Sequence, residues 1–235
     1  MRPLTIDRPK VLLPVDGRPL IDHALDRLRP HTSSLAVNVH VSQADLRAHL
    51  SSLEGPAVEQ SVESGVRLGT AGALAHLREW VDGRAVLVVN GDTWCPGGLD
   101  ALLDGWSGET IRILVAGAAE FGPGARIAGA LMPWADVRGL PATPSGLYEV
   151  SWRAAHTAGR LEAIGHEGPF VDCADPSDYL HANLLAAGGS SIGAGAVIRG
   201  SVEDSVVWDG AVVRSEEHLV RAIRTDTHRT VLIRR

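Results

Sequence analysis

The sequence predicts an α/β fold: a Rossmann-like, mostly parallel sheet with helices on both faces, followed by a short left-handed β-helix-like C-terminal segment. Between about residues 10 and 115, aliphatic runs of strand length alternate with longer runs of helical periodicity. Strands separated by helices pair in parallel through right-handed βαβ units. After residue 188 the rhythm changes to a six-residue aliphatic period. We therefore expect an α/β domain over residues 1–187 and a β-helix-like tail over 188–235.

The size and composition of the chain bound its class. Its 235 residues suffice for one α/β domain and a small appendage. The formal net charge is -6 without a concentrated Lys/Arg tract, which argues against a broad nucleic-acid-binding surface. No apolar run approaches the roughly 18 residues of a membrane span, and the N-terminus lacks a signal-peptide core. We therefore expect a cytoplasmic protein that binds neither nucleic acid nor membrane.

The helices and strands of the first half follow from periodicity. Residues 19–28 form a helical stripe with a proline near its start, and residues 35–41 alternate as a strand does. Ser42 is a suitable N-cap for a helix over 43–53. The run 85–89 contains three valines and predicts a strand that is buried on both faces. Further helices are expected at 71–81 and 99–103, and further strands at 58–62 and 110–115.

The pattern weakens between residues 120 and 150, where glycine and proline are frequent. Short aliphatic runs there and beyond still have the length of strands, and two longer runs have helical spacing. We expect strands at 127–132, 146–150, 161–166 and 170–171, and helices at 151–158 and 176–187.

A Gly-Gly-Ser-Ser stretch at residues 188–191 marks the start of the tail. Ile192 and Ile198 are six residues apart, as are Val206 and Val212. This spacing indicates one aliphatic side chain on each face of a triangular β-helix. Only about three coils fit into the tail, so it must pack on the main domain. The alternative is an irregular C-terminal hairpin.

The first candidate functional residue is Asp92, which follows Asn90 and Gly91 at the end of the 85–89 strand. Open α/β sheets place their ligand chemistry at the C-terminal ends of strands. A carboxylate there suits a hard cation, and Mg²⁺ usually arrives with phosphates. The alternative is a loop aspartate that caps the next helix.

A series of motifs then extends this observation over nearly the whole chain. They are Arg2–Thr5 with Arg8–Val15, Gly17–Ile21, Glu63 with Leu68–Leu74, Val88–Asp92, and Phe170–Asp172 with Pro176, Tyr179, Leu180 and Asn183. In this order they resemble the sugar-1-phosphate nucleotidyltransferase (NTP-transferase) family. The tail resembles the hexapeptide-repeat appendage of that family's mannose-1-phosphate guanylyltransferase branch.

The resemblance implies a reaction and its catalytic residues. A sugar 1-phosphate attacks the α-phosphorus of an NTP, which yields a nucleotide-sugar and pyrophosphate. The nucleophile is already an anion at neutral pH, so positioning and positive charge matter more than a general base. Mg²⁺ held by Asp92 and Asp172 would bridge the phosphates, and Lys10 would neutralise phosphate charge.

The resemblance also implies a set of substrate contacts. Gly69 and Thr70 would lie under the base and ribose, where a side chain at the glycine would collide. Glu149 would reach sugar hydroxyls. The implied substrate- and nucleotide-binding residues are Glu63, Gly69, Thr70, Asn90, Gly146 and Glu149.

Structural alternatives exist for these residues. Lys10 could be a solvated surface lysine, yet it is the only lysine in the chain. Asp172 could cap the following helix, although Asp175 suits that role better. We expect Cys173 to face away from the metal, because neighbours in a strand point to opposite faces. The thiolate of Cys95 does not suit Mg²⁺, so both cysteines are interpreted as structural.

The sequence departs from the family at its start. The family signature begins with a strand and a glycine-rich, phosphate-binding turn before the stretch matched by Arg2 and Pro3. Either the true start lies upstream of Met1, or the chain is truncated. As written, the sequence predicts weak NTP binding and low activity.

The leading hypothesis is an Mg²⁺-dependent enzyme of nucleotide-sugar biosynthesis, closest to mannose-1-phosphate guanylyltransferases. The alternative is a catalytically weak or inactive nucleotidyltransferase-like regulatory subunit that pairs with an active paralogue. An apolar β-helix face could also support a homo-oligomer.

Overall fold

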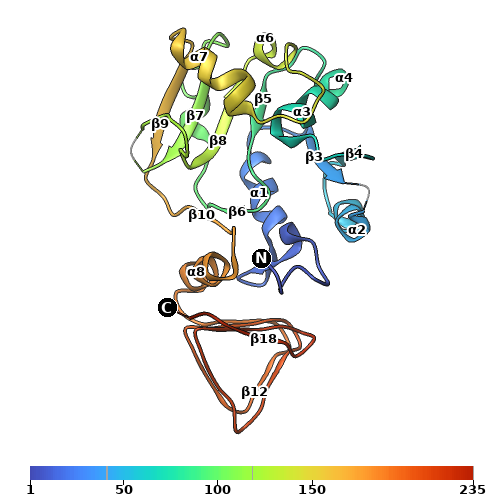
Figure 1. Ribbon diagram of the computed structural model, residues 1–235, viewed down its shortest axis with the longest axis vertical. Helices are drawn as coiled ribbons and strands as arrows, with labels where there is room; N and C mark the ends of the chain where they lie inside the picture. Colours follow the sequence, from blue (N-terminus) through green and yellow to red (C-terminus); the bar gives the residue numbers. More distant parts are fainter. Residues whose placement is uncertain (41, 118, 235) are drawn as a thin grey trace. The chain divides into compact units, whose positions relative to one another are not determined.

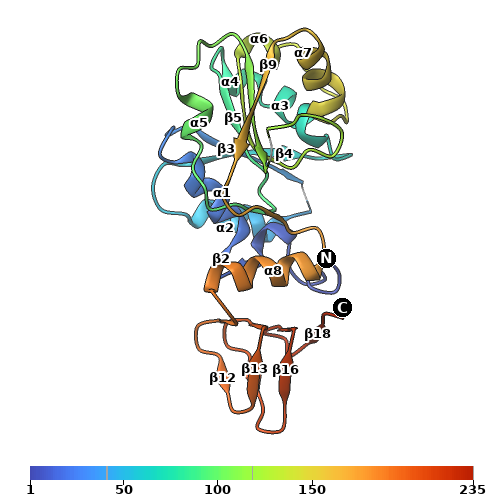
Figure 2. The same cartoon turned by 90° about the vertical axis from the view of Figure 1, so that its left-hand side faces the viewer.

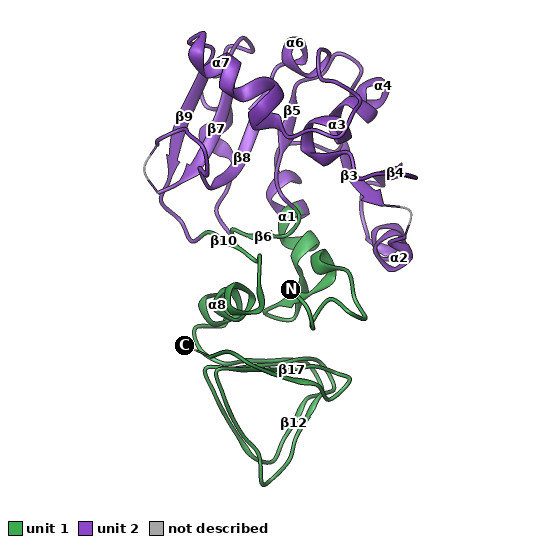
Figure 3. Cartoon of the chain, viewed as in Figure 1, with its two compact units in different colours: residues 1–24, 91–95, 170–235 green, residues 25–90, 96–169 purple. Residues whose placement is uncertain are grey.

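The computed structural model describes residues 1–40, 42–117 and 119–234, as two compact units that interleave along the chain (Figure 1, Figure 3). Unit 1 comprises residues 1–24, 91–95 and 170–235, and unit 2 comprises residues 25–90 and 96–169. The helix α1 (Leu20–Leu28) begins in unit 1 and ends in unit 2.

Unit 2 contains a four-stranded sheet of order β5-β8-β7-β9 and a separate parallel pair, β3-β4 (Figure 1, Figure 2). In the larger sheet β7 and β9 are parallel, whereas β8 runs antiparallel to both β5 and β7. The architecture is therefore mixed α/β rather than mostly parallel as predicted. The strands are β3 (Leu35–His40), β4 (Val58–Glu63), β5 (Val86–Val88), β7 (Ile111–Ala116), β8 (Ile127–Met132) and β9 (Leu161–His166). Val41, predicted to end the 35–41 strand, lies outside the described residues.

The strand β5 is less buried than the sequence predicts. Within the described ranges it pairs only with β8, and β3 pairs only with β4. All three residues of β5 are half-buried. The prediction of burial on both faces is wrong. The strand β5 lies at the edge of its sheet, so no neighbouring strand shields its second side from solvent.

The helices of unit 2 correct three further expectations. The predicted 71–81 helix is interrupted at Leu77, and Gln43 rather than Ser42 occupies the N-cap position of α2. The predicted 146–150 strand is instead largely a helical turn over 148–152, and the residues at its two ends, Leu147 and Trp152, are buried in the same cluster. The elements are α2 (Ala44–Ser52), α3 (Gly69–His76), α4 (Arg78–Val81), α5 (Asp100–Leu103), α6 (Trp134–Val137), the π-helical turn η2 (Tyr148–Trp152) and α7 (Arg153–Thr157).

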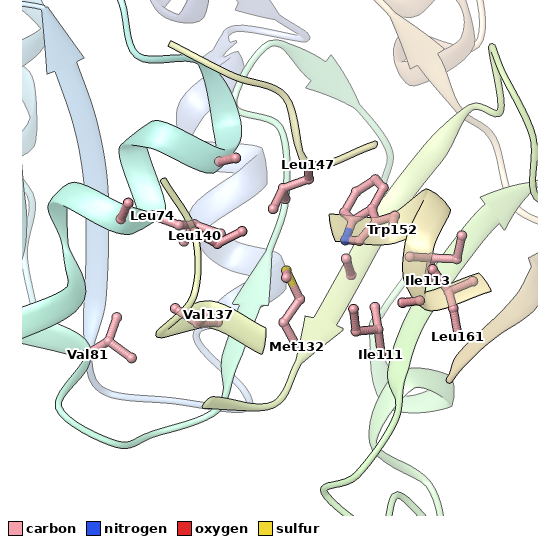
Figure 4. Packing of buried hydrophobic residues seen from close by; sticks show 14 of the residues in the cluster. Leu74, Val81, Ile111, Ile113, Met132, Val137, Leu140, Leu147, Trp152 and Leu161 are labelled. Carbon is pink, nitrogen blue, oxygen red and sulfur yellow. The ribbon is translucent and has the colours of Figure 1, made fainter. Parts of the chain in front are cut away.

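The core of unit 2 lies between the sheet and its helices. Ile111 and Ile113 of β7 are fully buried together with Met132 of β8. Figure 4 shows Trp152 and Leu161 beside this β7 pair, and Leu74 of α3 near Leu140. Over the described part of the chain, no helix is both long enough and apolar enough to cross a membrane.

Unit 1 is built from three separate stretches of sequence. Its shorter elements are η1 (Lys10–Leu12), β1 (Pro14–Val15), β2 (Arg18–Pro19), β6 (Thr93–Trp94), β10 (Val171–Asp172) and α8 (Pro176–Ala187). The strands β1 and β2 form a tight hairpin, and β6 pairs antiparallel with β10. One hydrophobic cluster joins the three stretches, since Leu4, Leu13, Trp94, Tyr179 and Trp208 all belong to it.

The end of unit 1, residues 190–234, forms a segment that we call the coil segment. Figure 1 shows it as superposed triangles, and its pairs β11-β14-β17, β12-β15 and β13-β16 are parallel. Only β17 and β18 pair antiparallel. The strands are β11 (Ser191–Ile192), β12 (Val197–Ile198), β13 (Ser201–Glu203), β14 (Val206–Val207), β15 (Val212–Val213), β16 (His218–Val220), β17 (Ala222–Arg224) and β18 (Thr230–Leu232).

The six-residue period is present, but its second pair shifts by one position. The strand register places Ile192 beside Val207 and Ile198 beside Val213, and Val207 and Val213 belong to the interior cluster of the coil segment. Val206, which the predicted period pairs with Val212, instead packs on the outer side with Tyr179 and Trp208. Because β14 and β15 each consist of two valines, the spacing from Val206 to Val212 and the spacing from Val207 to Val213 look the same in the sequence.

Successive coils approach so closely at Gly200 that a side chain does not fit. A Cβ atom there would collide with the backbone carbonyl oxygens of Glu217 and Arg214. Gly200→Ala should therefore lower the free energy of unfolding by about 1–3 kcal/mol, as overpacking does. Urea denaturation measures this loss. Gly189→Ala is the matched control because a Cβ atom at Gly189 meets nothing within 4 Å, so an equal loss in both variants would contradict the explanation.

Candidate functional site

Lys10, Asp92 and Asp172, the three predicted catalytic residues, lie together in unit 1. The Nζ of Lys10 is 2.7 Å from Oδ2 of Asp92 and 3.8 Å from Oδ1 of Asp172. All three side chains remain partly exposed. One ammonium group thus stands between two carboxylates that are 80 residues apart in sequence.

The pairing of β6 with β10 brings the two aspartates together. Asp172 is opposite Thr93 in this pair, and the backbone N–H of Cys173 donates to the Asp92 carbonyl at 3.3 Å. Because side chains alternate along a strand, Asp172 is exposed while Cys173 is buried in the hydrophobic cluster. Burial raises the pKa of the Cys173 thiol to about 12. The expected orientation of Cys173 is confirmed.

Lys10 is held in place through the residues immediately C-terminal to it. It opens the 3₁₀ turn η1, and Leu13 and Val15 just beyond are fully buried. The hydroxyl of Tyr179 donates to the Pro14 carbonyl, and the Asn183 side chain accepts from the backbone N–H of Asp16 at 3.0 Å. The helix α8 thereby fixes the backbone that carries Lys10.

The helix-capping alternatives for the two aspartates are excluded. Asp175 is the N-cap of α8, accepting from the backbone N–H groups of Ser177 at 2.7 Å and Asp178 at 3.0 Å. The next helix after Asp92 is α5, whose N-cap is Leu99. The Asp92 and Asp172 carboxylates therefore have no helix-capping role.

A second group of predicted residues lies in unit 2, where Glu63 ends β4. Glu63 is buried and accepts from Asn38 Nδ2 at 3.3 Å and from the Leu68 backbone N–H at 3.2 Å. It therefore holds the loop that precedes α3. Gly69 begins α3 with φ +67°, and a Cβ atom there would lie 2.6 Å from the Ser145 carbonyl oxygen. A side chain at Gly69 would thus collide with the protein's own backbone at Ser145, which by itself explains the glycine.

The other predicted contacts also lie in unit 2. Thr70 and Asn90 are exposed, at the first turn of α3 and just after β5. Gly146 and Glu149 are neighbours, since a Cβ atom at Gly146 would collide with the Glu149 carboxylate. The predicted residues are therefore divided between the Lys10 cluster in unit 1 and six positions in unit 2.

Sequence reasoning missed how unit 1 supports the lysine. The indole N–H of Trp208 donates to the Tyr179 hydroxyl at 2.9 Å, and that hydroxyl in turn donates to Pro14. Burial raises the pKa of Tyr179 well above its usual range. Arg8 lies over the Trp208 ring, 4.8 Å from its centroid, and pairs with Asp226 at 3.0 Å. Tryptophan in a glycine-rich tail is the one signal that could have indicated this role.

The chemistry of Asp92 and Asp172 fits a magnesium ion that arrives with a substrate. Among the described residues, no group of three or more His, Cys, Asp or Glu side chains could hold a metal by itself. Mg²⁺, however, is commonly bound through one or two carboxylates plus substrate phosphates. The two carboxylates beside Lys10 meet that smaller requirement.

Comparison with known proteins identifies a family for most of this α/β chain. Residues 5–158 match the MobA-like NTP transferase domain. The N-acetylmuramate alpha-1-phosphate uridylyltransferase of Caulobacter vibrioides is 36% identical over 122 residues, which cover 48% of this chain and 50% of that protein. The mannose-1-phosphate guanylyltransferase regulatory subunit alpha of Drosophila melanogaster is 30% identical over 115 residues, 44% of this chain and 26% of that protein.

Solved structures share the fold at low sequence identity. UDP-glucose pyrophosphorylase from Acinetobacter baumanii has a TM-score of 0.64 at 15% identity and covers 78% of this chain and 87% of that chain. HddC from Yersinia pseudotuberculosis, complexed with GMP-PN, has a TM-score of 0.61 at 16% identity, covering 79% and 93%.

The family match and the fold therefore define an α/β protein of the NTP transferase class. The chain belongs to the MobA-like NTP transferase domain family, and the predicted family relationship is confirmed. The chain spans no more than half the length of the two relatives named above.

The support of Lys10 can be tested at Tyr179. Tyr179→Phe removes the hydroxyl that joins Trp208 to Pro14, and leaves the buried indole N–H of Trp208 and the partly buried Pro14 carbonyl without this partner. We expect the free energy of unfolding to fall by about 1–3 kcal/mol, measured by urea denaturation. Tyr148→Phe, at the chain's other tyrosine, should cost less because Tyr148 is only partly buried. Equal losses would show that the buried hydroxyl has no special role.

Proposed function

We propose that the chain is a sugar-1-phosphate nucleotidyltransferase, which transfers a nucleotidyl group from an NTP to a sugar 1-phosphate and releases pyrophosphate. The observation that carries this proposal is the contact of Lys10 with both Asp92 and Asp172. Family membership supports the reaction class. A regulatory role without catalysis is less favoured, because the lysine and both aspartates are retained in one cluster.

We propose that Asp92 and Asp172 bind Mg²⁺ together with the NTP. The ion, when bound, neutralises phosphate charge and orients the reacting phosphates. Lys10 balances the two carboxylates in the substrate-free protein. The Lys10 ammonium, on its flexible stem, would donate to a phosphate oxygen of the substrate. The positive charge is then available where negative charge gathers in the transition state.

The residues around α3 are proposed to bind the nucleotide. Gly69 and Thr70 open that helix with exposed backbone, and helix N-termini favour anions and carbonyl groups. Glu63 is proposed to act indirectly, because its carboxylate accepts from the Leu68 backbone N–H and so positions the loop that precedes Gly69 and Thr70. Asn90, Gly146 and Glu149 remain proposed substrate contacts.

The base and the sugar are proposed with reference to the relatives. The uridylyltransferase acts on N-acetylmuramate 1-phosphate by its name, and the Drosophila protein is a guanylyltransferase subunit. Our sequence-based choice is GTP and mannose 1-phosphate, with the coil segment as a left-handed hexapeptide β-helix. The parallel triangular coils support this choice of branch.

An activity assay with four proteins tests the proposal. Pyrophosphate release is measured with Mg²⁺ for every pairing of four NTPs with mannose, glucose and N-acetylmuramate 1-phosphates. Asp92→Asn and Asp172→Asn should each lose about 100-fold or more in kcat/KM because the metal site loses a charged ligand. Asp45→Asn, at an exposed position of α2, is the matched control and should keep wild-type activity.

Removal of the metal gives an independent readout. Chelation with EDTA should abolish pyrophosphate release, and added Mg²⁺ should restore it. The low activity that the sequence predicts requires a high protein concentration in this assay. No release above the protein-free background with any substrate pair, or full activity in both aspartate variants, would refute the proposed function.

A further inference from the structure

Thr93 is a buried neighbour of the acidic pair to which the proposed function gives no role. It follows Asp92 directly and begins β6. The residue is only 6% exposed, and its Oγ1 is buried without a hydrogen-bond partner among the described residues. Buried hydroxyl groups are nearly always hydrogen-bonded, because an unpartnered one lowers stability. The Thr93 hydroxyl is thus available to a partner that the substrate-free protein does not provide.

The pairing of β6 with β10 places Thr93 beside Asp172. The two residues are opposite one another in the strand register. The adjacent pair, Cys173 and Asp92, is joined by the backbone hydrogen bond of 3.3 Å. Hydrogen-bonded and non-hydrogen-bonded pairs alternate along an antiparallel ladder, so Thr93 and Asp172 form a non-hydrogen-bonded pair. In such a pair the Cα atoms are about 4.5 Å apart, and the two side chains are neighbours on one face.

This face is the polar side of the strand pair. Trp94, Val171 and Cys173 belong to the hydrophobic cluster of unit 1. Because neighbours in a strand point to opposite faces, Thr93 and Asp172 both face away from that cluster. Rotation about the Cα–Cβ bond moves a threonine hydroxyl between staggered positions. The hydroxyl can therefore turn toward the carboxylate across the pair without a change of the backbone.

Lys10 contacts the two carboxylates unequally. Its Nζ is 2.7 Å from Asp92 Oδ2, which is a hydrogen bond, but 3.8 Å from Asp172 Oδ1, which is beyond hydrogen-bond range. The Asp172 side chain is also the more exposed of the two, at 60% against 39%. Carboxylates that bind a metal are themselves usually oriented by a hydrogen bond from the protein. Asp172 is therefore the carboxylate for which a further donor matters more.

We propose that Thr93 is a positioning residue for the acidic pair. In the substrate-bound protein its hydroxyl donates to the Asp172 carboxylate and holds it in the orientation that binds a divalent cation. This inference rests on the proposed function, in which Asp92 and Asp172 bind the cation together with phosphates. The competing explanation is that Thr93 is present only because a branched side chain suits a strand, which does not require the hydroxyl.

Three variants separate the hydroxyl from the shape of the side chain. Thr93→Val keeps the shape and removes the hydroxyl, whereas Thr93→Ser keeps the hydroxyl. Thr225→Val is the matched control, because Thr225 is 2% exposed and its Oγ1 is 3.0 Å from Thr227 Oγ1 and accepts from the Arg229 backbone N–H at 3.1 Å. Isothermal titration calorimetry measures how each protein binds the Mn²⁺–pyrophosphate complex, which supplies a divalent cation and phosphates without a choice of base.

Thr93→Val should weaken binding of the Mn²⁺–pyrophosphate complex about 10- to 100-fold, as the loss of a hydrogen bond that orients a metal ligand does. Thr93→Ser and Thr225→Val should bind it as the wild type does. Equal binding by the wild type and Thr93→Val would overturn the positioning role and leave the proposed function intact. No binding by the wild type would overturn the positioning role and the proposed metal site together.

Urea denaturation of the substrate-free proteins is the second readout, and it does not depend on the metal. Thr93→Val should unfold at the same urea concentration as the wild type or at a higher one, because the lost hydroxyl is buried without a partner among the described residues. Thr225→Val should unfold at a lower concentration, because its hydroxyl is hydrogen-bonded. A lower midpoint for Thr93→Val would show that the hydroxyl stabilises the fold instead, and would overturn the proposal.

Discussion

The buried hydroxyl of Tyr179 is the contact on which the arrangement of unit 1 depends. It accepts from the Trp208 indole and donates to the Pro14 carbonyl, so one oxygen joins the coil segment, α8 and the backbone beyond Lys10. A buried polar group is stabilising only when its partners are present. The hydroxyl therefore joins two of the three stretches of unit 1, and Trp94 of the third stretch packs in the same hydrophobic cluster. This packing positions Lys10 and the two aspartates.

The cluster of Lys10, Asp92 and Asp172 also explains why one lysine persists among many arginines. A lysine is a compact charge on a flexible stem, whereas an arginine would bind the carboxylates in a fixed, two-pronged geometry. Under the proposed function this charge has to exchange carboxylate partners for phosphate, which suits the flexible lysine. The structure therefore gives a physical reason for a feature that composition alone made conspicuous.

The sequence was most informative where local signals determine structure. The helix α8 has the predicted bounds because Asp175 and Pro176 begin it and Gly188 ends it; β8 and β9 also match. The π-helical turn at 148–152 was missed because Tyr148, Val150 and Trp152 have strand-like spacing. The mixed sheet was missed because the direction of β8 is set by its pairing with β5 and β7, which are distant in the sequence. The motifs identified Lys10 and both aspartates, but the tyrosine hydrogen bonds join residues 165 and 29 positions apart and leave no local pattern.

The interleaving of the two units has a consequence for biosynthesis. Residues 1–24 and 91–95 leave the ribosome long before residues 170–235, yet all three stretches share one hydrophobic cluster. Unit 2 is continuous enough to fold while the C-terminal part is still being translated. Leu4, Leu13 and Trp94, in contrast, remain without their packing partners until α8 and the coil segment emerge. Lys10 and Asp92 therefore lack their packing partners until the last part of the polypeptide is translated, and Asp172 itself lies in that part.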